Sequence, residues 1–272
     1  MFNLLKREIV SRRNAILGWG IGLALFATMY IGIYPEMAEE IQMMDLSDIS
    51  FYQAMGVEMG SFPGYLSSTV VQFMTVILGV YAIIAGTGTL AGEEDGGTLE
   101  LIVAAPLPRW QIVAMKALAL ALVLLLIQAI AAAGSVAVFS AVDVETEVTA
   151  GDLFLAVMSG WPLLLAFAML SLVLGAFLPT RRVAAMAATV LFIASYFGEG
   201  LLGMVSSLEP LRPLSLFYYF DATPAIFTEG VDAADVALLL GVALLFFVLA
   251  LLSFERRNIT VGAWPWQRAR AG

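Results

Sequence analysis

Four carboxylates interrupt an otherwise hydrophobic chain within residues 91–110, and they are the side chains best placed to do chemistry: Glu93, Glu94, Asp95 and Glu100. Gly92 and Gly97 have the spacing of the two glycines of a P-loop, which binds the phosphates of a nucleotide. A P-loop also needs a lysine, which is missing here, and three carboxylates occupy the positions where the phosphates would lie. Because these charges repel phosphate, the segment is not a nucleotide-binding site.

The composition also argues against metal-dependent and proteolytic chemistry. The 272 residues include no His and no Cys, so imidazole ligands, thiolate ligands and disulfides are all absent. A Glu-Glu pair at the end of a membrane helix is typical of intramembrane metalloproteases, but their zinc sites need His. A serine or aspartyl protease would need a paired base or a second intramembrane aspartate, and neither is found. We therefore expect no catalytic residue, metal site or cofactor in this chain.

The elements that carry these residues are hydrophobic helices. Of the residues, 61% are hydrophobic and 13% are charged, and the mean hydropathy is +0.93, so a lipid bilayer is the natural environment of the chain. A helix needs about 20 mostly apolar residues to span the hydrocarbon core. Six runs qualify, at residues 14–34, 66–89, 112–138, 153–178, 183–206 and 236–254. The sequence predicts an all-α polytopic membrane protein whose single transmembrane domain covers residues 1–272.

The basic residues predict the orientation of these spans. Every Lys and Arg except Arg212 falls on one face of the six-span arrangement, with Lys116 assigned to the loop before the third span. The positive-inside rule places this face in the cytoplasm, together with both termini and residues 91–110. The loops on the opposite face are acidic and contribute to the net charge of −9. They either attract cations or simply keep the loops solvated, and the second interpretation needs no further assumption.

Two amphipathic segments flank the first span. Residues 2–13 have Phe2, Leu5 and Ile9 on one helical face, which predicts a short N-terminal helix lying in the inner membrane interface. The alternative for these residues is a plain cluster of charges that sets the topology. Residues 37–48 also have an amphipathic pattern and predict a small external helix.

Few polar side chains lie inside the spans. Glu199 is the only acid within one, and the helical rise from Arg182 places it near the outer interface. Ionisable groups inside a membrane are candidates for function, so Glu199 is a candidate path-lining residue. Gln72 and Gln128 are candidates either to line a transport path or to form hydrogen bonds between helices, and the sequence leaves both roles open.

Residues 91–110 have the pattern of a docking element for a cytoplasmic protein. The acids are followed by Thr98 as a candidate helix cap, by a short apolar helical segment and by a proline stop at Pro106 and Pro108. Arg109 then leads into the third span. The alternative is an ordinary hydrophilic loop whose carboxylates remain solvated, and charge alone does not separate the two.

The segment GEEDGGTLELIVAAPLPRWQIVAMKALA resembles the loop after the second span in permeases of the ABC-2 family. The matching residues are Glu93, Glu94, Gly97, Thr98, Leu99, Glu100, Pro106, Arg109 and Lys116. The family usually has a basic residue between the acids, where Asp95 and Gly96 stand in this chain, and this puts one polar contact in doubt. The segment PLSLFYYFDATPAIFTEG, followed by a last span and FERRNI, resembles the closing region of the family, and the six-span layout agrees over the whole chain.

This resemblance implies a membrane subunit of an ATP-binding-cassette transporter in the plasma membrane, most often an exporter. Two six-span subunits pair as a homodimer or heterodimer, and a separate ATP-binding-cassette ATPase binds ATP and Mg²⁺. The loop between the second and third spans acts as a cytoplasmic coupling helix seated on that ATPase, here with Glu93, Glu94, Asp95, Gly97, Thr98, Leu99, Glu100 and Arg109. Residues 207–231 would supply short re-entrant helices before the last span. Nucleic acid is not an expected partner.

Two other classes of function remain open from the sequence. A secondary carrier or a channel would work without an ATPase, and a carrier typically has ionisable residues near the bilayer midplane and interrupted helices in paired positions. Neither feature is evident, although Gly160 and Pro162 lie within the fourth span. The third class is a membrane anchor that holds an ATPase without transporting anything.

Overall fold

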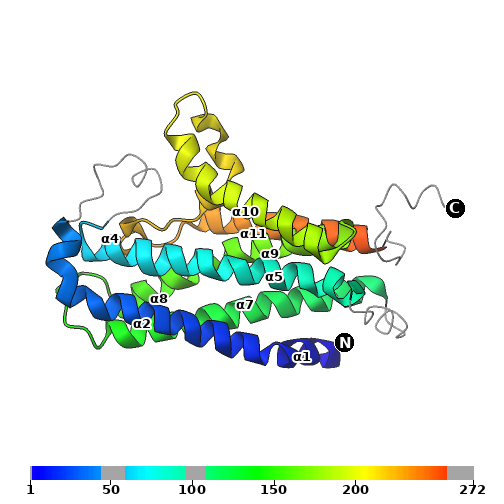
Figure 1. The fold of residues 1–272 in the computed structure, drawn as a ribbon, viewed down its shortest axis with the longest axis horizontal. Coiled ribbons are helices and arrows are strands. Elements are labelled where there is room, and N and C mark those ends of the chain that lie inside the picture. The colour runs from blue at the N-terminus through cyan, green and yellow to red at the C-terminus, as the bar shows by residue number, and fades with distance from the viewer. Residues whose placement is uncertain (1, 44–58, 96–107, 256–272) are drawn as a thin grey trace.

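The computed structural model of the chain describes residues 2–43, 59–95 and 108–255, and Figure 1 shows the helices into which they fold. In chain order the elements are α1 (Phe2–Ser11), α2 (Arg13–Met43), α4 (Phe62–Leu66), the π-helix η2 (Ser67–Gln72), α5 (Phe73–Asp95), α7 (Arg109–Phe139), α8 (Ala150–Met158), α9 (Gly160–Phe177), α10 (Arg181–Gly203), the 3-10 helices η3 (Glu209–Leu214), η4 (Leu216–Tyr219) and η5 (Pro224–Phe227), and α11 (Ala233–Glu255). These described residues contain no strand, and the predicted all-α fold is confirmed.

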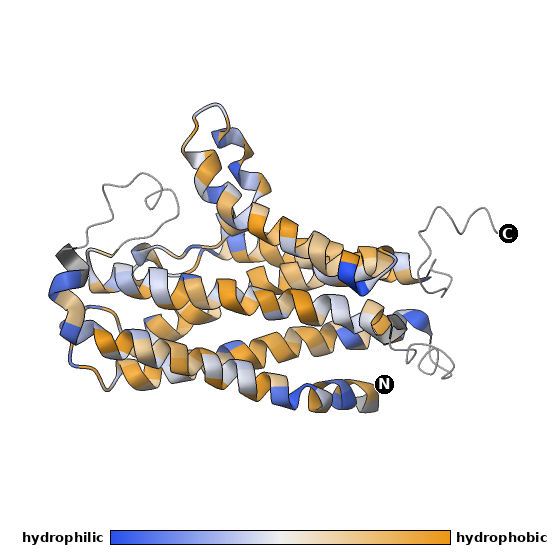
Figure 2. Cartoon of the chain, in the orientation of Figure 1, coloured by the Kyte–Doolittle hydropathy of each residue, from blue (hydrophilic) through white to orange (hydrophobic). Residues whose placement is uncertain are grey.

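Six stretches of the described chain are long and apolar enough to cross a membrane, and each overlaps one predicted span. They cover Arg13–Glu40, Phe62–Gly92, Arg109–Phe139, Ala150–Phe177, Arg181–Gly203 and Ala233–Glu255. Apolar residues cover these helices along most of their length, as Figure 2 shows, which is the pattern expected of helices surrounded by lipid and by one another. The prediction of six spans is confirmed.

The first span is longer than predicted. α2 continues through Pro35 as far as Met43, so the first part of the predicted external helix at 37–48 is an extension of the span. Residues 44–48 lie outside the described residues. Pro35 removes one backbone donor, but membrane helices tolerate proline when neighbouring groups satisfy the carbonyl that it leaves. The alanine and glutamates that follow are strong helix formers, and the helix therefore does not end at the proline.

The second and fourth spans are interrupted. In the second span η2 separates α4 from α5, and hydroxyl groups bond back to the backbone here, as when Thr69 Oγ1 donates to the Tyr65 carbonyl oxygen. In the fourth span α8 ends at Met158 and α9 begins at Gly160, so the break falls at Ser159. Irregular backbone of this kind is tolerated within a membrane where it is buried in protein or lines a cavity.

α5 and α9 form the inside of the bundle. The most apolar window of the second span is 72% buried, whereas those of the fifth and sixth spans are 17% buried. Gly86 allows α5 to approach α9 closely, because a Cβ at this position would lie 2.6 Å from the carbonyl oxygen of Ala168. Membrane helices commonly pack through small residues in this way. The outer helices α2, α10 and α11 direct most of their apolar surface away from the bundle.

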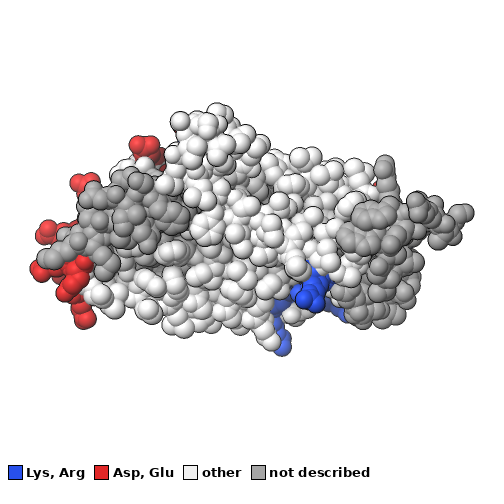
Figure 3. Space-filling view, turned by 45° about the horizontal axis from the view of Figure 1, so that its top comes forward, with Lys and Arg blue, Asp and Glu red and all other residues white. Residues whose placement is uncertain are grey.

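Charged residues separate toward the two ends of the bundle, as Figure 3 shows. We call the end that carries α1, the end of α5 and the start of α7 the basic end, and the opposite end the acidic end. The end of α11 also lies at the basic end, as expected for six spans (Figure 1). The predicted N-terminal helix is present as α1, and Arg12 joins it to α2.

The sequence predicts short helices within residues 207–231, and the three 3-10 helices η3, η4 and η5 lie there. The end of α10 and η3 stand out from the side of the bundle, in yellow in Figure 1, and we call residues 199–214 the side arm. Hydrogen bonds of Ser195 and Ser215 join α10 to the segment that follows η3. Ser215 Oγ donates to the Ser195 carbonyl oxygen at 2.7 Å, and Ser195 Oγ accepts a hydrogen bond from the Leu216 N–H at 2.9 Å.

Candidate functional site

The predicted docking segment, residues 91–110, is described at its two ends. α5 continues through Glu93, Glu94 and Asp95, so these residues form the last turn of a helix at the basic end. Negative groups at a helix C-terminus oppose the helix dipole by about 0.3–1 kcal/mol each, unless positive groups lie close by. That last turn contains no Lys or Arg. The last turn of α5 therefore consists of three acidic residues at the basic end.

Of the other predicted docking residues, Arg109 is described. It is the first residue of α7, and its side chain is partly exposed. The remaining predicted docking residues lie outside the described residues, and so does most of the predicted coupling helix: Gly97, Thr98, Leu99 and Glu100. What the structure describes is the two helices between which the segment runs, and we call residues 85–95 the α5 stem and residues 109–116 the α7 stem.

Lys116 is buried in the α7 stem, which corrects its predicted place in the loop before the third span. It lies about two turns inside α7, and its side chain has no exposed surface. A buried ammonium group is strongly unfavourable unless an opposite charge accompanies it. The Nζ atom of Lys116 lies 2.7 Å from Oε1 of Glu8 in α1, whose side chain is only 12% exposed. Glu8 in α1 therefore compensates the positive charge of Lys116, which is buried within α7.

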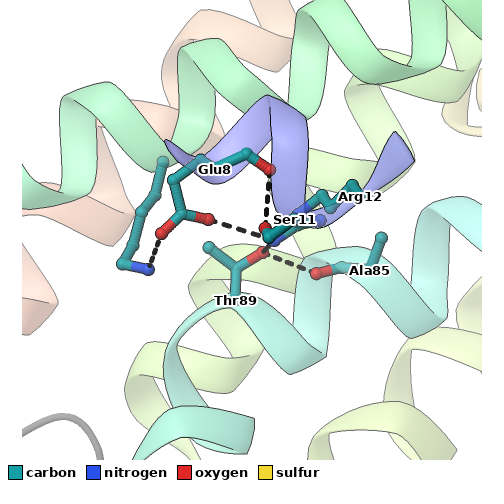
Figure 4. Close-up of polar contacts among 6 residues, drawn as sticks. Glu8, Ser11, Arg12, Ala85 and Thr89 are labelled. Carbon is teal, nitrogen blue, oxygen red and sulfur yellow. Dashed lines mark hydrogen bonds and ion pairs between the residues drawn. The ribbon is translucent and has the colours of Figure 1, made fainter. Parts of the chain in front are cut away.

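Arg12 extends this ion pair to a third helix. Its Nη2 lies 3.9 Å from Oε2 of Glu8 and donates to Oγ1 of Thr89 in α5 at 3.0 Å. The Thr89 hydroxyl donates its own proton to the Ala85 carbonyl oxygen at 2.6 Å. Figure 4 shows these contacts around α1. We call Glu8, Arg12, Thr89 and Lys116 the basic-end cluster, and it joins α1 to both stems.

α10 also contacts the α5 stem. Arg181, the first residue of α10, donates from Nη2 to the Ile84 carbonyl oxygen at 3.4 Å. Its side chain lies along Gly88 and Gly92, and a Cβ on Gly88 would lie 3.2 Å from that Nη2. The two glycines therefore make room for a guanidinium group next to the end of α5.

A cavity of about 670 Å³ lies toward the acidic end, among α10, α11 and the 3-10 helices. Two of the three predicted path-lining residues, Gln72 and Glu199, line it. Glu199 pairs with Arg212, whose guanidinium carbon also lies 5.4 Å from the centre of the Tyr218 ring. The hydrogen bond to Glu199 raises the pKa of Arg212 above its ordinary value, and burial opposes this in part. The stabilisation from this shift is present wherever arginine is protonated, which includes the whole physiological pH range.

The cavity has an acidic lining. Besides Glu199, four carboxylates border it: Asp221, Glu229, Asp232 and Asp235. Arg212 is the basic residue that borders it in the described chain. A concave surface with this balance of charge attracts cations and disfavours anions.

Gln128, the third predicted path-lining residue, is a buried residue of α7 whose side chain contacts α8. Its Nε2 donates to the Val157 carbonyl oxygen, close to the break at Ser159. A Cβ on Gly160, just after the break, would lie 2.9 Å from that Nε2. The hydrogen bond between helices, one of the two predicted roles of Gln128, is present, and a place on the transport path stays a prediction.

Sequence reasoning did not find the basic-end cluster, although parts of it gave a signal. Lys116 follows a run of apolar residues, and an ammonium group inside a span needs a partner within the protein. Glu8 and Arg12 are four residues apart in a predicted helix, which is the spacing of an intrahelical ion pair. The contact between Glu8 and Lys116 joins residues 108 positions apart. It depends on the packing of α1 against α7, for which the sequence contains no local pattern.

Comparison with known proteins agrees with this architecture. The family described as ABC-2 family transporter protein matches residues 2–259, which include α1, all six spans and residues 91–110. No curated protein gives a significant match. The family match covers nearly all of the 272 residues, and the six apolar helices are those of a multi-pass membrane protein. The chain therefore belongs to the ABC-2 family of transporter proteins.

Proposed function

We propose that the chain is the permease subunit of an ATP-binding-cassette exporter in the plasma membrane. It works as a dimer, and a separate ATPase that binds ATP and Mg²⁺ docks on residues 91–110. Membership of the ABC-2 family supports the class of transporter. The observation that carries the docking site is the last turn of α5, where Glu93, Glu94 and Asp95 follow one another at the basic end.

The charges of α5 supply a physical reason for docking. Three consecutive acidic residues give this segment a negative charge that Lys or Arg side chains of a partner would complement. Contacts of this kind fix the register and the choice of partner more than they add affinity. Arg12 donates to Thr89 of the α5 stem, and the Arg181 side chain lies along Gly88 and Gly92 of the same stem. A force on the docking segment would therefore act on a helix end that two other helical regions already contact.

The proposed orientation places the basic end in the cytoplasm, where ATP is available to the partner. The positive-inside rule supports this orientation, because the Lys and Arg side chains visible in Figure 3 lie toward this end. α1 and the end of α11 lie at the basic end, so both would face the cytoplasm (Figure 1). The acidic end, with the cavity, would then face outward.

The outer helices offer a surface for a second permease subunit. α2 borders a shallow groove of about 420 Å³ that contains Gly18, Gly22, Trp19 and Phe26. A Cβ on either glycine would have no atom within 4 Å. The Gly-x-x-x-Gly spacing lets a neighbouring membrane helix approach closely, which supports a dimer contact on this side.

The cavity toward the acidic end is our candidate for part of the transport path. Gln72 and Ser159 stand at the interruptions of the second and fourth spans, and both line the cavity together with Glu199. A secondary carrier also uses interrupted helices at its binding site. The family match favours the ATP-driven function, and dependence of transport on the ATPase separates the two.

Co-purification with a co-expressed ATP-binding-cassette ATPase from the same genome tests the proposed docking site. The test variant carries Glu93→Ala, Glu94→Ala and Glu100→Ala. We expect it to lose most of its bound ATPase, because the negative charges that attract the partner are gone. Insertion into the membrane should stay at the level of the unsubstituted chain, since the six spans are unchanged.

The matched control removes three exposed carboxylates at the acidic end of α2, through Glu36→Ala, Glu39→Ala and Glu40→Ala. Its net charge changes by the same amount, but the α5 stem is intact. We expect the control to bind the ATPase as the unsubstituted chain does. Equal co-purification of the test variant and the control would contradict the docking proposal.

A further inference from the structure

We propose that the cavity toward the acidic end binds an amphipathic organic cation, that is, a molecule with an apolar body and a positive charge. This inference names the class of substrate for the proposed function, and its meaning for transport rests on that function. The cavity has a volume of about 670 Å³, within the range of about 300–1,000 Å³ that is usual for sites of drug-sized molecules. Its lining decides which molecules of that size would bind.

The inner part of the cavity is apolar. Four hydrophobic residues that line it belong to the buried core, and each is at most 8% exposed: Phe217, Phe220, Ile226 and Leu239. A ligand with an apolar body would remove its own surface from water by packing against these side chains. A small hydrated ion would gain nothing from them, because it would have to lose its water to reach them.

The outer part of the cavity is acidic and reaches solvent. Asp221, Glu229 and Asp232 line it, and all three are exposed. Asp221 Oδ1 accepts a hydrogen bond from the Thr223 N–H at 2.8 Å. Asp232 Oδ1 accepts one from the Ala234 N–H at 2.7 Å, so the backbone holds both carboxylates in place. In the described chain five acidic residues and one basic residue line the cavity, and this balance attracts a cation and repels an anion.

The protein already holds one organic cation at the edge of this cavity, the guanidinium group of Arg212. It pairs with Glu199, and its central carbon lies 5.4 Å from the centre of the Tyr218 ring. Carboxylates and aromatic faces both bind organic cations, the first by charge and the second by the negative face of the ring. Tyr196 lies three positions before Glu199 in α10, so the two share a helix face, and both line the cavity. Tyr196 therefore adds a second aromatic ring to the same wall.

A metal ion is the alternative occupant of an acidic cavity, and the placement of the carboxylates disfavours it. Among residues 2–43, 59–95 and 108–255, no group of three acidic side chains is arranged to hold a metal ion. Mg²⁺ and Ca²⁺ need several oxygen ligands at about 2.0–2.6 Å. Negative charge that is spread around a cavity with an apolar interior instead suits a large cation.

Titration calorimetry of the purified chain in nonionic detergent, without any ATPase, tests the binding site. The probes are tetraphenylphosphonium and tetraphenylborate, which have nearly the same size and shape but opposite charge. We expect tetraphenylphosphonium to bind with saturation, and tetraphenylborate to give only the heat that it gives with detergent alone. Equal binding of the two ions would overturn the proposal, because the carboxylates would then only keep the edge of the cavity solvated.

Neutralising two of the lining carboxylates should weaken the binding of tetraphenylphosphonium. For Glu229→Gln/Asp235→Asn, which preserves the shape of both side chains, we expect affinity to fall about 2- to 30-fold, as for two partly exposed ion pairs. The matched control, Asp143→Asn/Glu145→Gln, removes the same charge from exposed residues between α7 and α8 and should bind as the unsubstituted chain does. Equal affinity of the two variants would contradict the site. Displacement of the probe by Mg²⁺ at constant ionic strength would assign the cavity to a metal ion and overturn the proposal.

The aromatic wall is tested by two substitutions of one residue. Tyr196→Leu removes a ring that faces the cavity, and we expect affinity for tetraphenylphosphonium to fall about 2- to 5-fold through the loss of a cation–π contact. Tyr196→Phe keeps the ring and should bind as the unsubstituted chain does. Equal affinity of the Leu and Phe variants would contradict recognition of the cation by the ring.

Failure of the proposed function would look different, because these titrations need no ATPase. ATP-dependent uptake of tetraphenylphosphonium is measured separately, in inside-out vesicles that contain the chain and its co-expressed ATPase. Selective binding of the cation without such uptake would contradict the ATP-driven function and leave the binding site standing. Docking of the ATPase without selective binding of the cation would contradict this inference alone.

Discussion

Glu199 and Arg212 form an ion pair at the base of the side arm, although 13 positions separate them in the chain. Glu199 is the acid within the fifth span, and Arg212 is the basic residue that lies on the opposite face of the membrane from the others in the six-span arrangement. Each residue compensates the other at the edge of the cavity. Their side chains are 20% and 33% exposed, so solvent partly screens the pair.

Removing the arginine alone should loosen the side arm. Arg212→Met leaves Glu199 without this partner, and we expect thermal unfolding in detergent to show a loss of about 1 kcal/mol, the upper end for a partly exposed pair. Arg182→Met, which changes an exposed arginine at the basic end, should unfold like the unsubstituted protein. Equal stability of the two variants would show that the ion pair does not hold the arm.

The pair of Glu8 and Lys116 should respond differently to single and double substitution. Glu8→Ala removes the carboxylate beside a fully buried ammonium, and we expect a loss of about 3–5 kcal/mol in the free energy of unfolding. Glu8→Ala/Lys116→Met should recover most of that loss, because an apolar replacement of a buried pair is close to neutral. Melting of both variants in the same detergent measures the difference. An equal loss in both would argue against burial of the lysine charge.

Gly86 should be intolerant of any side chain. A Cβ in Gly86→Ala would lie 2.6 Å from both the Ala168 carbonyl oxygen and the Ser171 Cβ, so α5 and α9 would have to move apart. We expect a loss of about 1–3 kcal/mol, as for other overpacked cores. The control is Gly241→Ala in α11, where a Cβ meets nothing within 4 Å and stability should not fall. Unchanged melting of Gly86→Ala would mean that the two helices do not pack as closely as described.

The spans were predictable because lipid imposes a simple requirement. Each must be a helix of sufficient length with few charges, and runs such as 112–138 and 236–254 meet that requirement on composition alone. The details inside the spans were not predictable in the same way. Pro35 is compatible with either a helix end or a continued helix, and tertiary surroundings decide between them. The break at Ser159 likewise depends on how Gly160 and Gln128 fit against each other.

The candidate site was predictable in part. The acids at 93–95 and the basic residue Arg109 stand out against apolar neighbours, so the docking segment can be found from charge and family resemblance. The partners of Lys116 and Glu199 could not be named, because both ion pairs join different elements. The sequence indicated only that Lys116 and Glu199, as charged residues within apolar spans, each needed a partner.

The central claim is that the basic end faces the cytoplasm and presents residues 91–110 to an ATPase, and cysteine labelling tests it most directly. Because the chain contains no Cys, Asp95→Cys and Glu145→Cys each introduce a single reactive thiol, the second at an exposed position at the acidic end. A membrane-impermeant maleimide added to intact cells should label Glu145→Cys and leave Asp95→Cys unlabelled, and both should react after permeabilisation. Labelling of Asp95→Cys in intact cells would contradict the claim.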